Sequence, residues 1–173
     1  MIDLKIQTLV LGILDTNCYI LKKDKCVLVI DPADNYEKIK EEIKNYNLVG
    51  VLITHHHFDH VGALSYFDKN LIYDNNNLLE KEYELGPFKF NVIKTYGHTD
   101  DSLTYYFRED NVMFVGDFIF KESIGRCDLP TGNFNIMKKS IEKIKAYPDN
   151  VVLYPGHDEY TTLGYEKINN PYF

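Results

Sequence analysis

Short apolar runs separated by polar turns recur along the whole chain. Runs of this kind, bounded by Gly, Pro, Asn and Asp, are typical of β-strands. The pattern therefore predicts strands over residues 4–11, 18–21, 26–30, 49–53, 71–73, 88–94, 103–107, 112–115 and 151–154.

Three stretches are predicted to be helical. The first follows Asp34 and Glu37, a pair with capping-box spacing, and the second follows Asn133 and stops at Pro148. A third, shorter helix is expected over residues 61–67. In the two longer helices the apolar side chains recur at the spacing of one helix face. These side chains are Tyr36, Ile39, Ile43 and Tyr46 in the first helix and Phe134, Met137, Ile141 and Ile144 in the second.

The order of these elements indicates two layers of sheet. Residues 26–54 have the order strand, helix, strand, which is consistent with a parallel βαβ unit. Two β-rich runs are each followed by a helix, and this order suggests two sheets with helices outside. The chain has no internal repeat, low-complexity segment or linker, so we expect a single domain over residues 1–173.

Composition and charge narrow the class of protein. The 173 residues are 45% hydrophobic and 26% charged, the usual balance of a globular domain. A formal net charge of −7 disfavours nucleic acid as a partner, and no apolar stretch reaches the ~20 residues of a membrane span. The N-terminal sequence reads as a strand and not as a signal peptide, and three cysteines without metal-ligand spacing favour a reducing compartment. We expect a cytoplasmic protein, monomeric or homodimeric, that acts on a small molecule.

The segment THHHFDH places four of the six histidines directly after an apolar run. Alternate side chains of an extended segment point to the same side, so His55 and His57 can converge while His56 faces away. Asp59 and His60 follow where the chain turns, and they can reach a second point nearby. Because imidazole and carboxylate groups are common ligands of zinc and other divalent ions, the segment is a candidate half of a metal site.

Three later strand ends have the same local pattern. His98, Asp117 and His157 each follow an apolar run and a glycine. Side chains at strand ends are held by a rigid scaffold, and glycine allows the backbone to turn tightly towards a crowded centre. We therefore expect these three strand ends to complete the site that begins in the histidine cluster.

The candidate ligands divide into two sets, and Asp117 has two carboxylate oxygens with which to bridge them. A catalytic zinc usually has three protein ligands and an open position, and paired ions lie ~3.5–4 Å apart, so we expect two divalent ions. Zinc is the first candidate, with iron or manganese as alternatives. The lack of cysteine among these motifs favours a hydrolytic site. The two sets are His55, His57 and His98, and Asp59, His60 and His157.

This set of motifs resembles the metallo-β-lactamase superfamily. The resemblance implies an α/β fold, the αββα four-layer sandwich, with two mixed β-sheets, helices on the outer faces and metals at one edge between the sheets. The matching stretches, in the order of the family, are THHHFDH at 54–60, GHT at 97–99, GD at 116–117 and GH at 156–157.

Within the superfamily the chain is similar to short glyoxalase II-like hydrolases. The stretches TNCYIL, SIGRCDLPTGN and the terminal NNPYF carry this similarity. It implies hydrolysis of glutathione thioesters such as S-lactoylglutathione. Our leading hypothesis for the mechanism is that a metal-bound hydroxide, oriented by the catalytic residue Asp59, attacks the thioester carbonyl. The chain departs from the family in two respects, since it lacks the C-terminal helical region that helps hold glutathione and has Asp100 and Asp101 where Pro-Gly often follows GHT. The substrate-binding residues are therefore not assigned.

Other functions stay open at this point. Persulfide dioxygenases are similar in sequence and bind one iron, which by resemblance would be held by His55, His98 and Asp117. Hydrolysis of lactones or phosphodiesters is a further alternative, and a non-enzymatic metal-binding or regulatory domain is another class. The lack of a secretion signal disfavours a β-lactamase, and the acidic charge disfavours a nuclease.

Residues near these motifs also have structural interpretations. We expect Arg126 and Asp128 to pair with each other and Cys127 to be a small buried residue. Asn17 and Tyr19 are expected to brace the first strands and not to contact the substrate.

Overall fold

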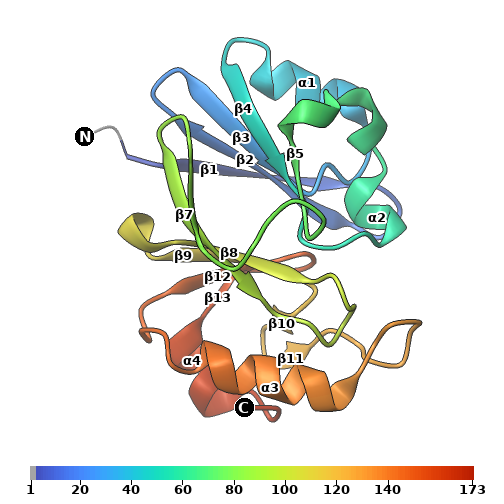
Figure 1. The fold of residues 1–173 in the computed structure, drawn as a ribbon, viewed down its shortest axis with the longest axis vertical. Helices are drawn as coiled ribbons and strands as arrows, with labels where there is room; N and C mark the ends of the chain where they lie inside the picture. Colours follow the sequence, from blue (N-terminus) through green and yellow to red (C-terminus); the bar gives the residue numbers. More distant parts are fainter. Residues whose placement is uncertain (1–2) are drawn as a thin grey trace.

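The computed structural model describes residues 3–173 as four layers in the order helix, sheet, sheet, helix. Helix α1 (Tyr36–Ile43) lies above the first sheet in Figure 1 and α2 (Phe58–Val61) lies at its right-hand end, whereas α3 (Phe134–Ile144) and α4 (Leu163–Asn169) lie below the second sheet. The predicted αββα sandwich is therefore confirmed.

The first sheet has the strand order β1-β2-β3-β4-β5. Its first two pairs are antiparallel, and the pairs β3–β4 and β4–β5 are parallel. Helix α1 joins the parallel strands β3 and β4, so the predicted βαβ unit is present. The strands are β1 (Lys5–Leu11), β2 (Thr16–Lys23), β3 (Cys26–Ile30), β4 (Asn47–Leu52) and β5 (Ile72–Tyr73).

The second sheet has the order β13-β12-β9-β8-β7-β6, in which only the pair β12–β9 is parallel. A separate hairpin of two short strands, β10 and β11, follows β9. Both main sheets are thus mixed, as expected. The strands are β6 (Glu82–Leu85), β7 (Phe88–Lys94), β8 (Leu103–Phe107), β9 (Val112–Gly116), β10 (Ile119–Phe120), β11 (Ser123–Ile124), β12 (Val152–Pro155) and β13 (Thr161–Thr162).

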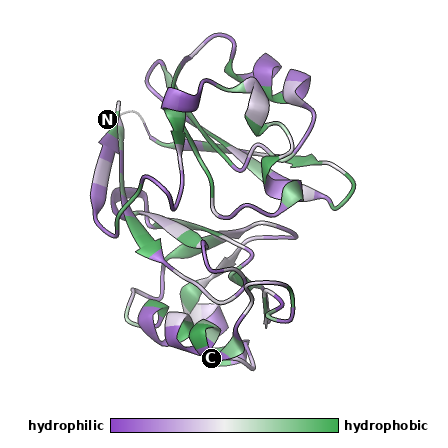
Figure 2. Cartoon of the chain, turned by 45° about the vertical axis from the view of Figure 1, so that its right-hand side comes forward, coloured by the Kyte–Doolittle hydropathy of each residue, from purple (hydrophilic) through white to green (hydrophobic). Residues whose placement is uncertain are grey.

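Three hydrophobic clusters fill the spaces between the layers. Aromatic side chains such as Tyr105 and Phe114 pack between the two sheets. Ile39 and Ile43 of α1 pack on the outer face of the first sheet, and Ile141 of α3 packs on the second. Figure 2 shows hydrophobic stretches on many of the strands and both hydrophobic and hydrophilic residues on the helices. Burial of one helix face and one or both strand faces is what the hydrophobic periodicity predicts.

The first helix differs in detail from its prediction. Asn35, and not Asp34, is the N-cap, because the Asn35 side chain accepts a hydrogen bond from the backbone N–H of Lys38. Asn35 has a left-handed backbone with φ 46°, a conformation that Asn tolerates. The helix ends at Ile43, so Tyr46 lies beyond it and is exposed.

The short helix predicted over residues 61–67 is wrong in its bounds. Helix α2 begins earlier, at Phe58 inside the histidine motif, and a separate 3₁₀ turn covers Leu64–Tyr66. At Gly62 the backbone passes close to Ala33, because an added Cβ at Gly62 would lie 2.2 Å from the Ala33 carbonyl oxygen. Strands β6, β10, β11 and β13 and helix α4 were not predicted, because each is too short to show a clear hydrophobic period.

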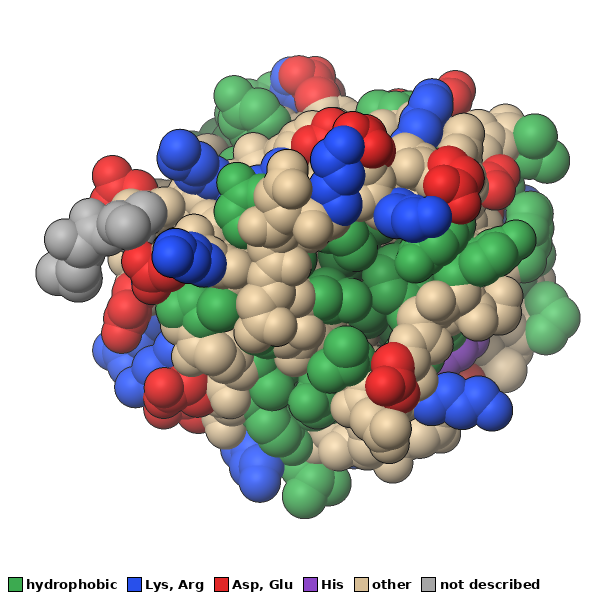
Figure 3. All heavy atoms as spheres, turned by 90° about the horizontal axis from the view of Figure 1, so that it is seen from above, with side chains coloured by type: hydrophobic (Ala, Val, Ile, Leu, Met, Phe, Trp, Pro, Cys, Tyr) green, Lys and Arg blue, Asp and Glu red, His purple; other side chains and the backbone are tan. Residues whose placement is uncertain are grey.

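The surface carries charges of both signs. Figure 3 shows acidic and basic side chains interspersed on one face, with a histidine visible at its margin. Exposed pairs such as Lys40 with Glu37, 3.4 Å apart on α1, contribute only a few tenths of a kcal/mol each, about the usual value for such helix pairs. None of the helices in the described part of the chain has the length and apolar character needed to cross a membrane.

Candidate metal centre

The seven predicted ligands come together at one edge between the two sheets. They follow the ends of four strands, β4, β7, β9 and β12, so residues far apart in sequence meet in space. Within each of two groups, one ligand atom per residue lies within 4.8 Å of the others. The groups are His55, His57, His98 and Asp117, and Asp59, His60 and His157.

Three imidazoles form the centre of the first group. Nδ1 of His57 lies 3.2 Å from Nε2 of His55 and 2.9 Å from Nε2 of His98. Asp117 completes the group, with Oδ2 at 3.5 Å from Nε2 of His98. His55 and His98 are buried and His57 is half-buried, so the group is closed by protein on one side and accessible on the other.

The second group lies against the first. Oδ2 of Asp59 is 3.2 Å from Nε2 of His157 and 3.5 Å from Nε2 of His60. Asp117 also faces this group, with Oδ1 at 3.2 Å from Nε2 of His60 and Oδ2 at 3.5 Å from Nε2 of His157. The Asp117 carboxylate therefore lies between the two groups, which is the position predicted for a bridge.

The donor set fits divalent metal ions. Nε2 of His60 and Oδ1 of Asp117 are fully buried and have no hydrogen-bond partner among the described residues. A buried polar atom without a partner costs about 1–3 kcal/mol, so such atoms need a ligand in a stable protein. Imidazole nitrogens and carboxylate oxygens are suitable donors for zinc, iron and manganese.

Gly156 makes room for this arrangement. An added Cβ at Gly156 would lie 2.2 Å from Oδ1 of Asp117 and 2.5 Å from Cε1 of His60. We predict that Gly156→Ala displaces both side chains and lowers the bound metal per chain about twofold or more relative to the wild type. Metal quantification after dialysis checks this, with circular dichroism to verify the fold. A folded variant with the metal content of the wild type would contradict it.

Asp31 and Thr54 form a hydrogen-bond network with His60. The sequence pattern did not identify this role for either residue. Asp31 is buried, and its carboxylate accepts hydrogen bonds from Nδ1 of His60 at 2.8 Å and from Oγ1 of Thr54 at 2.6 Å. The backbone N–H of Thr54 donates to the same carboxylate at 2.8 Å. Because the Nδ1 proton of His60 is held by Asp31, Nε2 is left as the free donor atom towards the site.

Two backbone carbonyl oxygens orient the later histidines in the same way. Nδ1 of His98 donates to the carbonyl of Arg126 at 2.7 Å, and Nδ1 of His157 donates to the carbonyl of Leu14 at 3.0 Å. Each bond fixes the tautomer and turns Nε2 towards the centre.

His56 faces away from the centre, as predicted. Its Nδ1 lies 2.6 Å from Asp101 and its Nε2 lies 3.1 Å from Asp74. The hydrogen bond with Asp101 raises the pKa of His56. Burial opposes ionisation of Asp101, but the hydrogen bonds from His56 and Thr99 outweigh it and lower the pKa of Asp101 to about 2. Asp101, one of the two residues that replace Pro-Gly after the GHT motif, thus forms an ion pair with His56 that holds this loop beside the candidate ligands.

Interactions between the carboxylates and the histidines of the centre shift the pKa values of both. The interactions with Asp117 and Asp59 raise the pKa of His157 to about 10. Burial lowers the pKa of His60, but the charges of Asp31 and Asp117 outweigh it and raise that pKa to about 10. Burial also raises the pKa of Asp117, but the interactions with His157 and His60 hold it well below its usual range.

These shifts predict that metal affinity rises with pH. Metals bind neutral imidazole, whereas pKa values of about 10 keep His60 and His157 protonated at neutral pH in the protein stripped of metal. Each proton released on binding increases the association constant about tenfold per pH unit, over the range below those pKa values. Zinc competition with a chromophoric chelator at pH 6, 7 and 8 measures the slope. A slope of zero would show that these histidines are already neutral.

A cavity of about 510 Å³ opens above the two groups. Apolar side chains, including Leu14, Phe58 and Phe120, form much of its wall, and Arg126 is the one Lys or Arg among the described residues that line it. Arg126 pairs with Asp128 through two contacts of 2.8 Å, which confirms their predicted pairing. Both side chains of this pair are exposed, so it contributes little stability.

The other structural interpretations are largely correct. Nδ2 of Asn17 and the hydroxyl of Tyr19 both donate to the carbonyl of Pro155, so these residues brace the end of β12 just before His157. Cys127 is only half-buried, because it lies in the exposed loop after β11.

A buried network that the sequence did not predict holds the hairpin β10–β11 beside the cavity. Glu166 is fully buried and accepts hydrogen bonds from Oγ1 of Thr161, from Nδ2 of Asn170 and from the backbone N–H of Glu122. Nδ2 of Asn170 also donates to the carbonyl of Ser123 at 2.9 Å. The C-terminal helix therefore positions one wall of the cavity.

Comparisons with known proteins agree with this geometry. The profile of the Metallo-beta-lactamase superfamily matches residues 11–74 and 72–157. A probable metallo-hydrolase of Streptococcus pyogenes is 31% identical over 98% of this chain and 90% of its own length. The hydroxyacylglutathione hydrolase GloC of Haemophilus influenzae is 29% identical over 90% of this chain and 92% of its own length.

Solved structures give the same result. The BLEG-1 B3 metallo-beta-lactamase superposes with a TM-score of 0.89 at 29% identity, over 97% of this chain and 99% of that one. TTHA1623 in a di-iron-bound form superposes with a TM-score of 0.86 at 27% identity, over 96% of this chain and 100% of that one.

The αββα sandwich with a His/Asp centre at the sheet edge defines a class of metal-dependent hydrolases. This chain belongs to the metallo-beta-lactamase superfamily and is similar to its metallo-hydrolases.

Proposed function

We propose that this chain is a cytoplasmic thioesterase that hydrolyses acyl thioesters of the hydroxyacylglutathione type at a centre of two zinc ions. The observation that carries the proposal is the position of Asp117 between two complete groups of ligands, with Asp59 at the floor of an accessible cavity. The similarity to a hydroxyacylglutathione hydrolase over nearly the whole chain supports the choice of substrate class.

The residues around Asp59 fit a role in orienting water. When bound, two divalent ions polarise a carbonyl oxygen and lower the pKa of water towards ~7. Oδ2 of Asp59 accepts a hydrogen bond from Oγ1 of Thr16 at 2.9 Å, which fixes the direction of the carboxylate. Burial raises the pKa of Asp59, but the interactions with His157 and His60 hold it well below its usual range. Asp59 therefore stays ionised and accepts a hydrogen bond from the attacking water.

The cavity suits a thioester in shape and polarity. Leu14, Phe58, Phe120 and Leu129 offer apolar contacts to an acyl chain and to the methylene beside sulfur. Its volume of about 510 Å³ is in the usual range for small-molecule sites. The leaving thiolate is stable at neutral pH, so a strong general acid is not required.

Anaerobic purification followed by metal quantification and a substrate panel tests the proposal. We expect two zinc ions per chain and turnover of S-lactoylglutathione above that of lactones and phosphodiesters. One bound iron, with oxygen uptake on glutathione persulfide, would instead support a dioxygenase that uses His55, His98 and Asp117. Turnover of a lactone alone would retain the metal centre and reject the thioester.

A further inference from the structure

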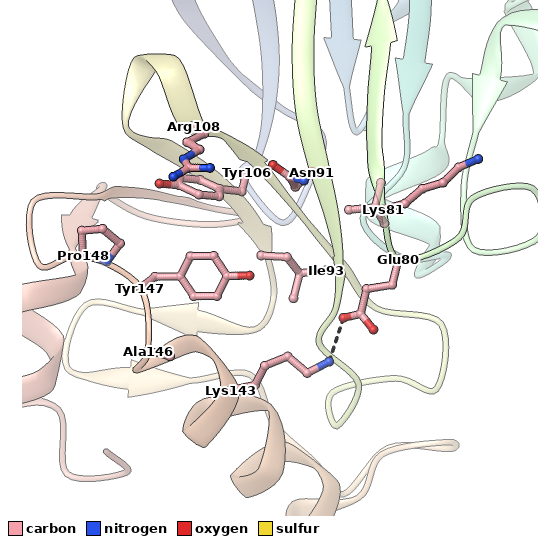
Figure 4. A pocket seen from close by; sticks show the side chains of 11 residues that line it. Glu80, Lys81, Asn91, Ile93, Tyr106, Arg108, Lys143, Ala146, Tyr147 and Pro148 are labelled. Atoms are coloured by element: carbon pink, nitrogen blue, oxygen red, sulfur yellow. Dashed lines mark hydrogen bonds and ion pairs between the residues drawn. The ribbon is translucent and has the colours of Figure 1, made fainter.

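A second cavity, of about 650 Å³, lies away from the metal centre on the outer side of the second sheet. Strands β7 and β8 form one wall, and the C-terminal end of α3 with the segment after it forms the other. Figure 4 shows Arg108 beside the ring of Tyr106, with Tyr147 facing them and Ile93 along one side. The proposed thioesterase reaction does not use this cavity.

Three polar side chains line this cavity: Asn91, Tyr106 and Tyr147. Their side-chain amide and hydroxyl groups make no hydrogen bond with the described residues. Burial, followed by the nearby charge of Glu80, raises the pKa of Tyr147, so its hydroxyl stays protonated as a donor. These three groups can donate hydrogen bonds to a ligand with several acceptor oxygens.

The charge of the cavity is positive, in a chain with a net charge of −7. The chain has two arginines, and Arg126 is paired with Asp128, whereas Arg108 forms no ion pair with the described residues. Lys143 is neutralised by Glu80 at 2.8 Å, and Lys81 points away from the space in Figure 4. One unpaired guanidinium is thus available, and guanidinium binds carboxylate and phosphate oxygens in a bidentate manner.

We propose that this cavity binds a small organic oxyanion, a carboxylate or phosphate monoester on a planar body, as an effector of the metal centre. The oxyanion lies on Arg108 and accepts hydrogen bonds from Tyr147 and Asn91. The planar body packs against the ring of Tyr147 and the exposed Pro148.

A series of hydrogen bonds links the cavity to the metal centre. Nζ of Lys143 donates to the carbonyl of Lys94 at 3.0 Å, and Oγ of Ser140, one turn earlier on α3, donates to the carbonyl of Tyr96 at 2.6 Å. The backbone N–H of Asn133, at the start of the helix, donates to the carbonyl of Gly97 at 2.7 Å.

Residues 94–97, which these hydrogen bonds hold, lead directly into His98. Helix α3 and its N-cap Asn133 therefore hold three of the four backbone carbonyl groups that precede this candidate ligand. Glu80 adds a further contact, because it accepts the backbone N–H of Lys94 at 3.1 Å and also binds Lys143. An oxyanion on Arg108 places a negative charge in the cavity that Lys143 also lines, and its attraction for the Lys143 ammonium changes the hold of Lys143 and Glu80 on residues 94–98.

Calorimetric titration with AMP and with 4-hydroxybenzoate tests binding, with adenosine and phenol as neutral controls. We expect at least one of the two anions to bind and the neutral compounds not to bind. Arg108→Ala should weaken binding about tenfold or more, the value of one lost charge-assisted contact. Lys89→Ala is the matched control, because Lys89 is an exposed cation on the same strand β7 that does not line the cavity.

The outcomes separate the parts of the proposal. Binding of AMP alone identifies a phosphate ligand and binding of 4-hydroxybenzoate alone a carboxylate, and either supports the site. Failure of both anions, or equal weakening by Arg108→Ala and Lys89→Ala, overturns it. In the metal-stripped protein, saturation should shift the amide NMR signals of residues 94–98, and binding without these shifts overturns the link to His98. Neither measurement depends on thioester turnover, so the site and the proposed activity are tested separately.

Discussion

Asp59→Asn is expected to lower kcat for thioester hydrolysis by about 10²–10⁴-fold, the usual loss when a positioned proton acceptor is removed. The amide keeps the shape of the side chain and can still accept the hydrogen bond that Thr16 donates at 2.9 Å. It lacks the negative charge that holds the attacking water. Steady-state kinetics, together with metal content and thermal unfolding, measure the effect.

Asp158→Asn is the matched control for this variant. Asp158 also lines the cavity, but its carboxylate makes no hydrogen bond with the described residues. Its backbone is left-handed at φ 62°, a conformation that Asn adopts as readily as Asp. We expect its kcat to stay within about threefold of the wild type. Equal losses in the two variants would mean that the charge of the cavity matters and the position of Asp59 does not.

Local sequence patterns were sufficient to predict which ligands would meet. His98, Asp117 and His157 each follow a strand of one sheet, and the histidine motif follows a strand of the other. Strands that end at the same edge deliver their next residues to the same place, so the prediction needed only strand ends and residue chemistry. The division of the histidine motif between two groups came from the alternation of side chains in an extended segment. Asp117, which was predicted as a bridge, lies with the first group and also faces the second.

The supporting residues could not be found in this way. Asp31 precedes a proline, which reads as an ordinary turn signal, and its role depends on contacts with Thr54 and His60 far along the chain. Glu166 and Asn170 belong to a short helix whose purpose is visible only once the hairpin β10–β11 lies against it. Such contacts depend on the relative placement of elements, which hydrophobic periodicity does not specify.

The candidate ligands and the buried residues that hold them in place differ in their expected response to mutation. Ligands such as His57 lie at an accessible cavity, so their replacement removes chemistry and leaves most packing intact. Asp31 is buried at 2% exposure, and its loss affects both the fold and the centre. A comparison of stability in the metal-stripped state with metal affinity therefore separates the two kinds of residue.

Asp31→Asn is expected to lower the free energy of unfolding by about 3 kcal/mol and the metal affinity by about 10–100-fold. The amide presents one acceptor oxygen, whereas the carboxylate accepts from His60 and from the Thr54 hydroxyl and backbone N–H. At least one buried donor is then left without a partner, and Nδ1 of His60 is no longer held, so its Nε2 loses its direction.

Urea unfolding of the metal-stripped protein measures the first effect, and chelator competition measures the second. Asp34→Asn is the control, because Asp34 is exposed and its side chain only accepts a hydrogen bond from the backbone N–H of Asn35. That variant should change stability by less than about 0.5 kcal/mol and leave metal affinity unchanged. A stable Asp31→Asn protein with weakened metal binding would mean that Asp31 acts only through the orientation of His60. Lost stability with normal metal affinity would mean that His60 is held by packing alone.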